Sequence, residues 1–162
     1  MITGGVITIS DKGSRNERED ISGPEITRML SDLDIRITDY DIIPDEKEII
    51  QDKLKQYTDN KNLDLVVTTG GTGVSPRDVT PDATLEVIEK ELPGMAEAMR
   101  RESMKKTPHA MISRAVAGIR GQSLIINLPG SPKGARENLA VLLPALKHTI
   151  EKLKGDMSDC GG

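Results

Sequence analysis

The sequence predicts an α/β fold with a doubly wound, mostly parallel sheet that is flanked by helices and carries a late β-hairpin. Short runs of β-branched and aliphatic residues alternate along the chain with amphipathic helical stretches. Residues 114–128 contain two apolar runs around a glycine-containing turn, which indicates the hairpin. The length of 162 residues corresponds to about one domain. We expect this domain to cover residues 1–154, followed by a flexible tail over residues 155–162.

Each element is predicted from its local pattern. Strands are expected where β-branched residues cluster or alternate with polar ones, at 4–9, 35–43, 63–67 and twice within 114–128. Helices are expected where apolar residues recur at helical spacing, from residue 22, and over about 45–57, 81–91, 93–105 and from 131 onward. Ser22 and Glu25 have the spacing of a capping box. Pro144 is expected to kink or split the last helix.

The composition excludes several classes of function. The chain has two tyrosines and no Phe or Trp, so its core must be aliphatic and it lacks aromatic platforms for stacking nucleic-acid bases. The net charge of −4 further argues against a DNA- or RNA-binding protein. Cys160 is the single cysteine and cannot form an internal disulfide, which favours a reducing compartment. Without a basic leader or a long apolar run, we expect a cytoplasmic protein that does not enter a membrane.

The run TTGGTGVSPRDVTPDAT at 68–84 is the most informative segment. A buried-type strand leads directly into the loop Gly70–Gly73, where glycines allow backbone amides to approach an anion closely. Asp78 follows five residues after Gly73, and a carboxylate beside such a loop can hold a divalent cation against phosphate. The loop therefore indicates a site for a phosphorylated ligand with magnesium. Alternatively the glycines merely form a turn and Asp78 caps the next helix, although Thr80 is better placed to cap it.

Two other acidic positions have an equally simple structural interpretation. Asp45 and Glu48 open an expected helix and could form only a capping pair, or Asp45 could take part in catalysis. Ser10 and Asp11 end the first strand, at the sheet edge where open α/β folds collect ligands. The alternative for this pair is an ordinary turn.

A second strand-to-helix junction lies at LPGSPKG, residues 128–134. The start of a helix offers free amides and a positive dipole end, which suits an anion, and Lys133 would add charge. Ser131 with Pro132 is also a good N-cap, and both roles are compatible. Upstream of the hairpin, Arg114 is either a phosphate clamp or a plain surface arginine.

Four segments together carry a family resemblance. TTGGTGVSPRDVTPDAT, PGMAEAMR (93–100), ISRAVAGIRG (112–121) and LIINLPGSPKGARENL (124–139) closely resemble the molybdopterin adenylyltransferase family of the MogA/MoaB type, whose module also occurs in gephyrin. The likeness extends from the first strand to the end of the last helix. It implies the molybdopterin-binding fold, a homotrimer, and transfer of AMP from MgATP to molybdopterin with release of pyrophosphate. It also implies a partner enzyme that inserts molybdenum, whereas the composition and charge argue against nucleic acid or a membrane as a partner.

The resemblance also assigns roles to individual residues. The family's two functional aspartates fall on Asp45 and Asp78, which we interpret as Mg²⁺ ligands or as organisers of Mg²⁺-bound water. The family's pterin- and nucleotide-binding segments fall on Ser10, Asp11, Gly70, Gly71, Thr72, Gly73, Ser113, Pro129, Gly130 and Ser131.

Two further functions stay open from the sequence. One is a non-catalytic molybdopterin-binding scaffold, and the other is a nucleotide pyrophosphatase, as in the related competence-damage-type module. The segment PGMAEAMR could supply a subunit interface, although Met95 and Met99 fit a core equally well.

Overall fold

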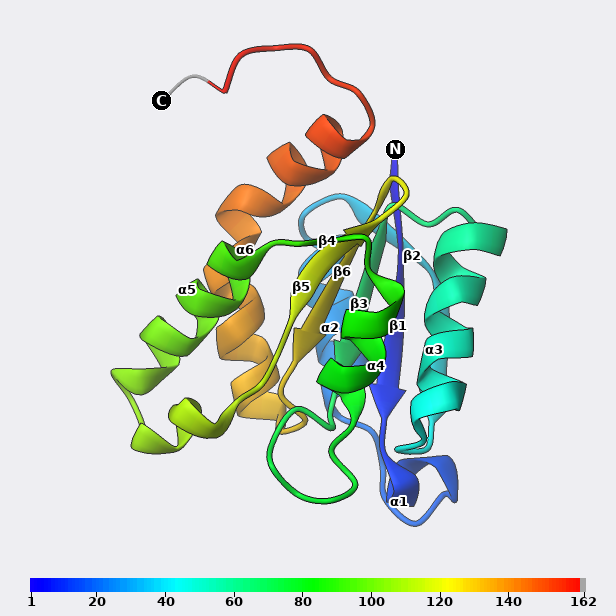
Figure 1. Cartoon of the computed structure of the whole chain (residues 1–162), viewed down its shortest axis with the longest axis vertical. Helices are drawn as coiled ribbons and strands as arrows, with labels where there is room; N and C mark the ends of the chain where they lie inside the picture. The colour runs from blue at the N-terminus through cyan, green and yellow to red at the C-terminus, as the bar shows by residue number, and fades with distance from the viewer. Residues whose placement is uncertain (161–162) are drawn as a thin grey trace.

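The computed structural model describes residues 1–160, which contain one six-stranded sheet with the order β2-β1-β3-β6-β5-β4 (Figure 1). The first four of these strands are parallel, and β5 and β4 extend one edge in antiparallel pairing. The doubly wound, mostly parallel sheet and the late β5–β6 hairpin are therefore confirmed. The strands are β1 (Ile2–Ile9), β2 (Ile35–Ile43), β3 (Leu65–Thr69), β4 (Lys90–Glu91), β5 (Ala117–Arg120) and β6 (Ser123–Leu128).

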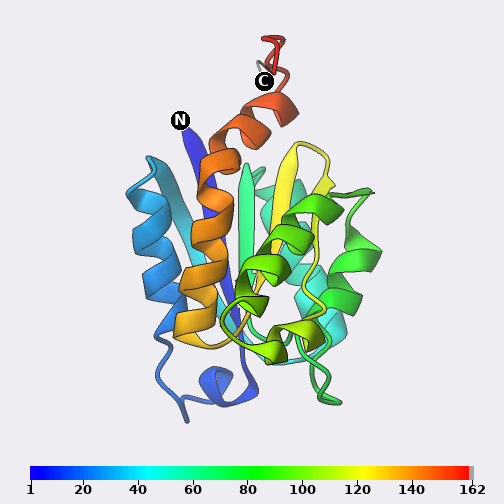
Figure 2. The same ribbon diagram turned by 90° about the vertical axis from the view of Figure 1, so that its left-hand side faces the viewer.

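Helices cover both faces of the sheet. Helices α2, α5 and α6 pack on one face, and α3 and α4 pack on the other (Figures 1 and 2). No helix in the described part of the chain combines the length and apolar character that a membrane crossing requires. The helices are α1 (Asp11–Ser14), α2 (Ser22–Ser31), α3 (Lys47–Lys55), α4 (Thr80–Val87), α5 (Pro93–Met104) and α6 (Pro132–Leu153), with a π-helix at Gln56–Asn60 and a 3₁₀ helix at Pro108–Ile112.

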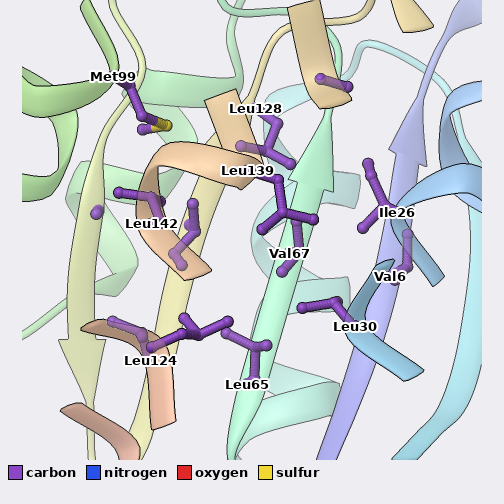
Figure 3. Close-up of a cluster of buried hydrophobic side chains, with 14 of the residues drawn as sticks. Val6, Ile26, Leu30, Leu65, Val67, Met99, Leu124, Leu128, Leu139 and Leu142 are labelled. Atoms are coloured by element: carbon purple, nitrogen blue, oxygen red, sulfur yellow. The ribbon is translucent and has the colours of Figure 1, made fainter. Parts of the chain in front are cut away.

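The core is aliphatic, as the composition predicts, apart from the fully buried Tyr57. On one face, strand residues such as Val67 pack against Leu30 of α2 and Leu139 of α6 (Figure 3). Met99 of α5 is 1% exposed and belongs to this cluster, and Met95 packs against it. The segment 93–100 therefore contributes its apolar side chains mainly to the core of its own chain.

Several predicted element ends are wrong. The helix expected over 81–91 ends at Val87, because Lys90 and Glu91 pair with β5 as strand β4. The capping box at Ser22 is absent: this residue lies inside α2 and its hydroxyl donates to the carbonyl of Gly130 at 2.9 Å. The side chain of Asp20 accepts the amide of Gly23 instead.

Pro144 does not split the last helix, which runs unbroken from Pro132 to Leu153. Proline removes one helical hydrogen bond and leaves the carbonyl four residues earlier without its usual donor. Both Pro144 and Ala140 are exposed, so water can satisfy that carbonyl, while Leu142 and Leu146 hold the helix on the sheet. Residues 155–160 of the expected tail follow this helix, and residues 161–162 lie outside the described part of the chain.

The strand order fixes where a ligand site can form. The chain leaves β1 to one side to build β2 and returns to the other side to build β3, so the connections diverge between β1 and β3. Ligands of open α/β sheets bind in the crevice at the carboxyl ends of the strands at such a point. Helix α1 and the loop before α4 lie at this edge, at the bottom of Figure 1.

Candidate active site

Two neighbouring clefts occupy this edge of the sheet, and Ser131 lines both. We call the larger one, of about 590 Å³, the acidic cleft, because Asp20, Asp45 and Asp78 contribute to its walls. The smaller one, of about 280 Å³, is called the Ser113 cleft. Of the residues singled out in the sequence, the acidic cleft contains Ser10, Asp45, Gly70, Gly71, Asp78, Gly130 and Ser131, and the Ser113 cleft contains Thr72, Gly73, Ser113, Pro129 and Ser131.

The glycine loop separates the two clefts, and its shape requires glycine. Gly70 and Gly71 have φ of +107° and +67°, which L side chains rarely adopt. A Cβ on Gly70 would lie 2.2 Å from the carbonyl oxygen of Ile9. A Cβ on Gly71 would lie 3.0 Å from Asp45 Oδ1, and one on Gly73 would lie 2.9 Å from Asp78 Oδ2. Both carboxylates therefore lie directly against the loop.

The loop offers some of its amides to a ligand, although fewer than the sequence indicates. The amide of Gly70 donates to the carbonyl of Leu128 at 3.0 Å and is already used. The amides of Gly71, Thr72 and Gly73 donate to no residue within 1–160. Successive free amides in such a turn form a concave site for an anion.

Asp45 and Asp11 hold each other in place. The amide of Asp11 donates to Asp45 Oδ2 at 2.9 Å, and the amide of Asp45 donates to Asp11 Oδ1 at 3.0 Å. Helix α3 begins at Lys47, and no side chain caps it. The capping interpretation of Asp45 is therefore wrong. Burial raises the pKa of Asp45, and the nearby charges of Asp11 and Asp78 raise it further.

Arg77, which the sequence analysis did not single out, completes this cluster. Its guanidinium donates to both carboxylate oxygens of Asp11 at 3.0 Å and to Glu46 at 3.0 Å. These bonds hold the pKa of Asp11 below its usual range, the hydrogen bond from Arg77 being the largest cause. Asp11 lines neither cleft, since its carboxylate is engaged by Arg77 and by Asp45. Asp11 therefore contributes by its hydrogen bonds to Asp45 and Arg77 and not as part of a cleft wall.

Asp78 does not cap the following helix. Its Oδ2 accepts the amide of Ser75 at 3.0 Å, and α4 begins at Thr80 without a side-chain cap. Thr80 does not cap it either, because its hydroxyl donates to the carbonyl of Gly70 at 2.9 Å. The hydroxyl of Thr80 therefore fixes the glycine loop, and the carboxylate of Asp78 is left at the wall of the acidic cleft.

The junction from Pro129 to Ser131 is fixed by hydroxyl groups from other elements. Thr69 donates to the carbonyl of Pro129 at 2.7 Å, and Ser22 donates to that of Gly130. Ser131 caps α6 as predicted, since its hydroxyl accepts the amide of Gly134 at 3.1 Å. Lys133 is exposed and lines neither cleft.

Arg114 fits neither interpretation offered by the sequence. Its guanidinium is bonded to the carbonyls of Gly73 and Asp78 and to the carboxylate of Asp82. It is therefore neither a plain surface arginine nor a cation left open for phosphate. The sequence holds no signal for this role, because these contacts join positions 32 to 41 residues apart.

The donor groups of the acidic cleft fit a magnesium ion. Asp45 Oδ1 and the Oδ1 atom of Asp78 accept no hydrogen bond from residues 1–160. Within these residues no group of three His, Cys, Asp or Glu side chains is arranged to hold a metal. Mg²⁺ is commonly bound by one or two carboxylates, with waters and substrate phosphates as its other ligands. Asp45 and Asp78 are the residues that would supply the two carboxylates.

The fold and the site together define a class of protein: an open α/β protein with a cleft of glycines and carboxylates at the switch point of its sheet, where such folds bind ligands. The comparison with known protein families identifies the family within this class. Residues 5–148 match the MoCF_biosynth family, described as "Probable molybdopterin binding domain". The chain belongs to this family.

Individual relatives agree with the assignment. The chain is 45% identical over 154 residues to the molybdopterin adenylyltransferase of Helicobacter pylori, covering 94% of this chain and 88% of that protein. It is 43% identical over 142 residues to the molybdopterin adenylyltransferase of Escherichia coli K12, covering 83% and 70%. The crystal structure of the molybdopterin biosynthesis enzyme MoaB from Thermus thermophilus superposes with a TM-score of 0.91 at 47% identity, covering 96% and 98%.

Proposed function

We propose that this protein is a molybdopterin adenylyltransferase that acts in molybdenum cofactor biosynthesis. Relatives about 45% identical over most of the chain carry this name. One observation of the structure supports it above the others: Asp45 and Asp78 lie against the same glycine loop and line the same cleft. This arrangement matches a reaction whose main demand is to neutralise and align phosphates.

The proposed reaction transfers an adenylyl group. An oxygen of the terminal phosphate of molybdopterin forms a bond to the α-phosphorus of ATP, and the bond from that phosphorus to the bridging oxygen breaks. Pyrophosphate leaves with the electron pair. The attacking phosphate monoester is already anionic at neutral pH, so no general base is required. The protein must position the two substrates and stabilise charge.

The residues divide this work between the two clefts. The acidic cleft takes the ATP phosphates beside Gly71, whereas Thr72 and Gly73, whose amides are also free, line the Ser113 cleft. Magnesium, held there by Asp45 and Asp78, would neutralise charge on the phosphates when bound. The Ser113 cleft takes the pterin. Because Ser131 lines both clefts, this arrangement brings the molybdopterin phosphate next to the site of transfer.

An assay with purified protein, molybdopterin and MgATP tests the proposal. We expect adenylylated molybdopterin and pyrophosphate to form in equal amounts. Release of AMP without a molybdopterin acceptor would support the pyrophosphatase function instead. Tight binding of molybdopterin with no product would support a scaffold. The named relatives do not favour either of these alternatives.

We also infer a homotrimer, and a molybdenum-inserting enzyme as the acceptor of the product. Three apolar side chains are exposed at the end of α5 and in the 3₁₀ helix: Met104 at 47%, Met111 at 63% and Ile112 at 52%. Exposed apolar side chains that lie close together are typical of an interaction surface. The interface of the proposed trimer is therefore assigned to these three exposed residues and not to Met95 and Met99, which pack in the core.

A further inference from the structure

We propose that Arg114 is a positioning residue, which holds the main chain of Asp78 beside the glycine loop. The inference rests on the adenylyltransferase function proposed above. The guanidinium of Arg114 donates from Nε to the carbonyl of Gly73 at 2.8 Å and from Nη2 to the carbonyl of Asp78 at 2.6 Å. The amide of Arg114 also donates to the carbonyl of Thr72 at 2.8 Å. One residue thus joins both ends of the segment 73–78.

This segment has little else to hold it. Residues 74–77 are all exposed, and Val74 is 63% exposed, so no side chain between Gly73 and Asp78 is anchored in the core. Segments with few buried apolar contacts open at low free energy. The conformation of the loop therefore depends on polar contacts, namely those of Arg114, those of Arg77, and the turn between Ser75 and Asp78.

Asp82 orients the guanidinium for this task. Both of its carboxylate oxygens lie 3.2 Å from Arg114 Nη1, and it belongs to the first turn of α4. A planar guanidinium can donate to a carboxylate and to two carbonyls at once, whereas an ammonium group lacks this fixed fork. Lysine at position 114 would keep the charge but could not hold both carbonyls in the same geometry.

Arg120 provides a matched control. It donates to the carbonyl of Val87 at 2.9 Å and forms two bonds with the carboxylate of Asp59, at 2.9 and 2.7 Å. Its contacts therefore resemble those of Arg114 in kind, and the two side chains are 26% and 38% exposed. Neither arginine lines a cleft, and unlike Arg114, Arg120 bonds to no residue of the segment 73–78. A loss that comes only from removing a structural arginine should appear in both variants.

The kinetic test compares Arg114→Lys with Arg120→Lys. We expect Arg114→Lys to lower kcat by about 10- to 100-fold, because small displacements of a reacting group are costly. The KM for ATP should change by less than about threefold, since Gly71, beside which the ATP phosphates are proposed to bind, lies outside the segment 73–78. Arg120→Lys should lower the Tm by a similar amount and leave kcat unchanged. Equal kcat values for the two variants would overturn the proposal.

A rescue experiment separates the guanidinium from the rest of the side chain. Methylguanidinium added to Arg114→Ala should restore part of kcat, and added to Arg120→Ala it should restore none. Asp82→Asn keeps both carbonyl contacts of Arg114 and should reduce kcat less than Arg114→Ala does. If Asp82→Asn reduces kcat as much as Arg114→Ala does, the loss comes from the ion pair between Arg114 and Asp82. The bonds from Arg114 to the carbonyls of Gly73 and Asp78 would then not determine kcat, and the proposal fails.

Hydrogen exchange tests the proposal without an activity assay. In Arg114→Lys the amides of Ser75 and Asp78, which are hydrogen-bonded within this segment, should exchange faster than in the wild type, while those of β1 and β3 stay unchanged. Unchanged exchange at Ser75 and Asp78 would overturn the role of Arg114 even if the enzyme is active. A wild-type protein that transfers no AMP would instead overturn the proposed function, and this exchange measurement would still decide the role of Arg114.

Discussion

Asp11 and Asp45 each accept the backbone amide of the other, although 34 residues separate them in the chain. Asp11 follows β1 and Asp45 follows β2, so this exchange ties together the carboxyl ends of two neighbouring strands. The same exchange aims the remaining oxygen of Asp45 at the glycine loop. Arg77 balances the charge of Asp11, which leaves Asp45 as the partly buried carboxylate with a raised pKa.

Replacing Asp45 with Asn should strongly reduce activity while preserving the fold. The side-chain oxygen of Asn can still accept the amide of Asp11, but the charge that would hold magnesium is lost. We expect turnover to fall by at least about a hundredfold, with little change in Tm at neutral pH. Steady-state kinetics and thermal unfolding measure the two effects. Wild-type turnover in Asp45→Asn would show that this carboxylate is only structural.

The pH dependence of stability should reveal the raised pKa of Asp45. A carboxyl whose pKa is higher in the folded than in the unfolded state destabilises the fold when it is ionised. This cost is present at neutral pH and disappears as the pH falls through the folded pKa. The free energy of unfolding of Asp45→Asn should therefore slightly exceed that of the wild type at pH 7, and this difference should shrink in acid. A difference that grows in acid would contradict the raised pKa.

Asp78→Asn should separate chemistry from binding. The side-chain oxygen of Asn can still accept the amide of Ser75, so the turn at 75–78 is kept. We expect turnover to fall by at least about a hundredfold, through lost organisation of the metal, while molybdopterin still binds. Calorimetry with molybdopterin and an AMP-transfer assay measure these effects. Unchanged turnover would remove Asp78 from the active site.

Gly71→Ala should damage the site more than the backbone conformation alone explains. A Cβ at Gly71 would lie 2.4 Å from the hydroxyl of Thr80 and 3.0 Å from Asp45 Oδ1. Gly121→Ala is the matched control, because Gly121 also has a positive φ, of +58°, but no atom within 4 Å of its Cβ position. Both variants should lose about 1–2 kcal/mol of stability from the left-handed conformation. Only Gly71→Ala should also lose turnover, and equal turnover in the two variants would contradict this geometry.

Removal of magnesium should stop transfer but not pterin binding. Without a cation, the charge between the ATP phosphates and the molybdopterin phosphate is uncompensated, so no AMP transfer is expected in EDTA. Molybdopterin should still bind, because its proposed contacts at the glycine loop and at the start of α6 are backbone amides. Calorimetry in EDTA tests binding, and restored magnesium should restore transfer. Metal-dependent pterin binding would show that the roles of amides and carboxylates are divided differently.

The proposed assembly can be checked by light scattering at micromolar concentration. A mass near three times the chain mass of 17.6 kDa is expected. Met111→Glu should shift the mass toward a monomer, because a charge would enter the exposed apolar group formed with Met104 and Ile112. Met157→Glu is the control, since Met157 is 92% exposed and lies outside this group. A monomeric wild-type protein would contradict the trimer.

The sequence by itself determined the layers of the fold and the local shape of the ligand loops. The alternation of strand and helix patterns implies a parallel sheet, because each apolar face must be covered by another element. The glycines at 70 and 71 need positive φ, and Ser131 caps the helix that begins beside it. These features depend on a residue and its immediate neighbours, and such neighbours are visible in the sequence.

Only the tertiary structure decided what the polar side chains at the sheet edge contact. Thr80 and Ser22 resemble helix caps in the sequence, yet their hydroxyls donate to the carbonyls of Gly70 and Gly130. Arg114 holds the two ends of the loop before α4, and no local pattern marks it. A polar side chain bonds to whichever group the packed sheet brings within reach, and local spacing does not contain that information. Strand order therefore set the partners of these residues.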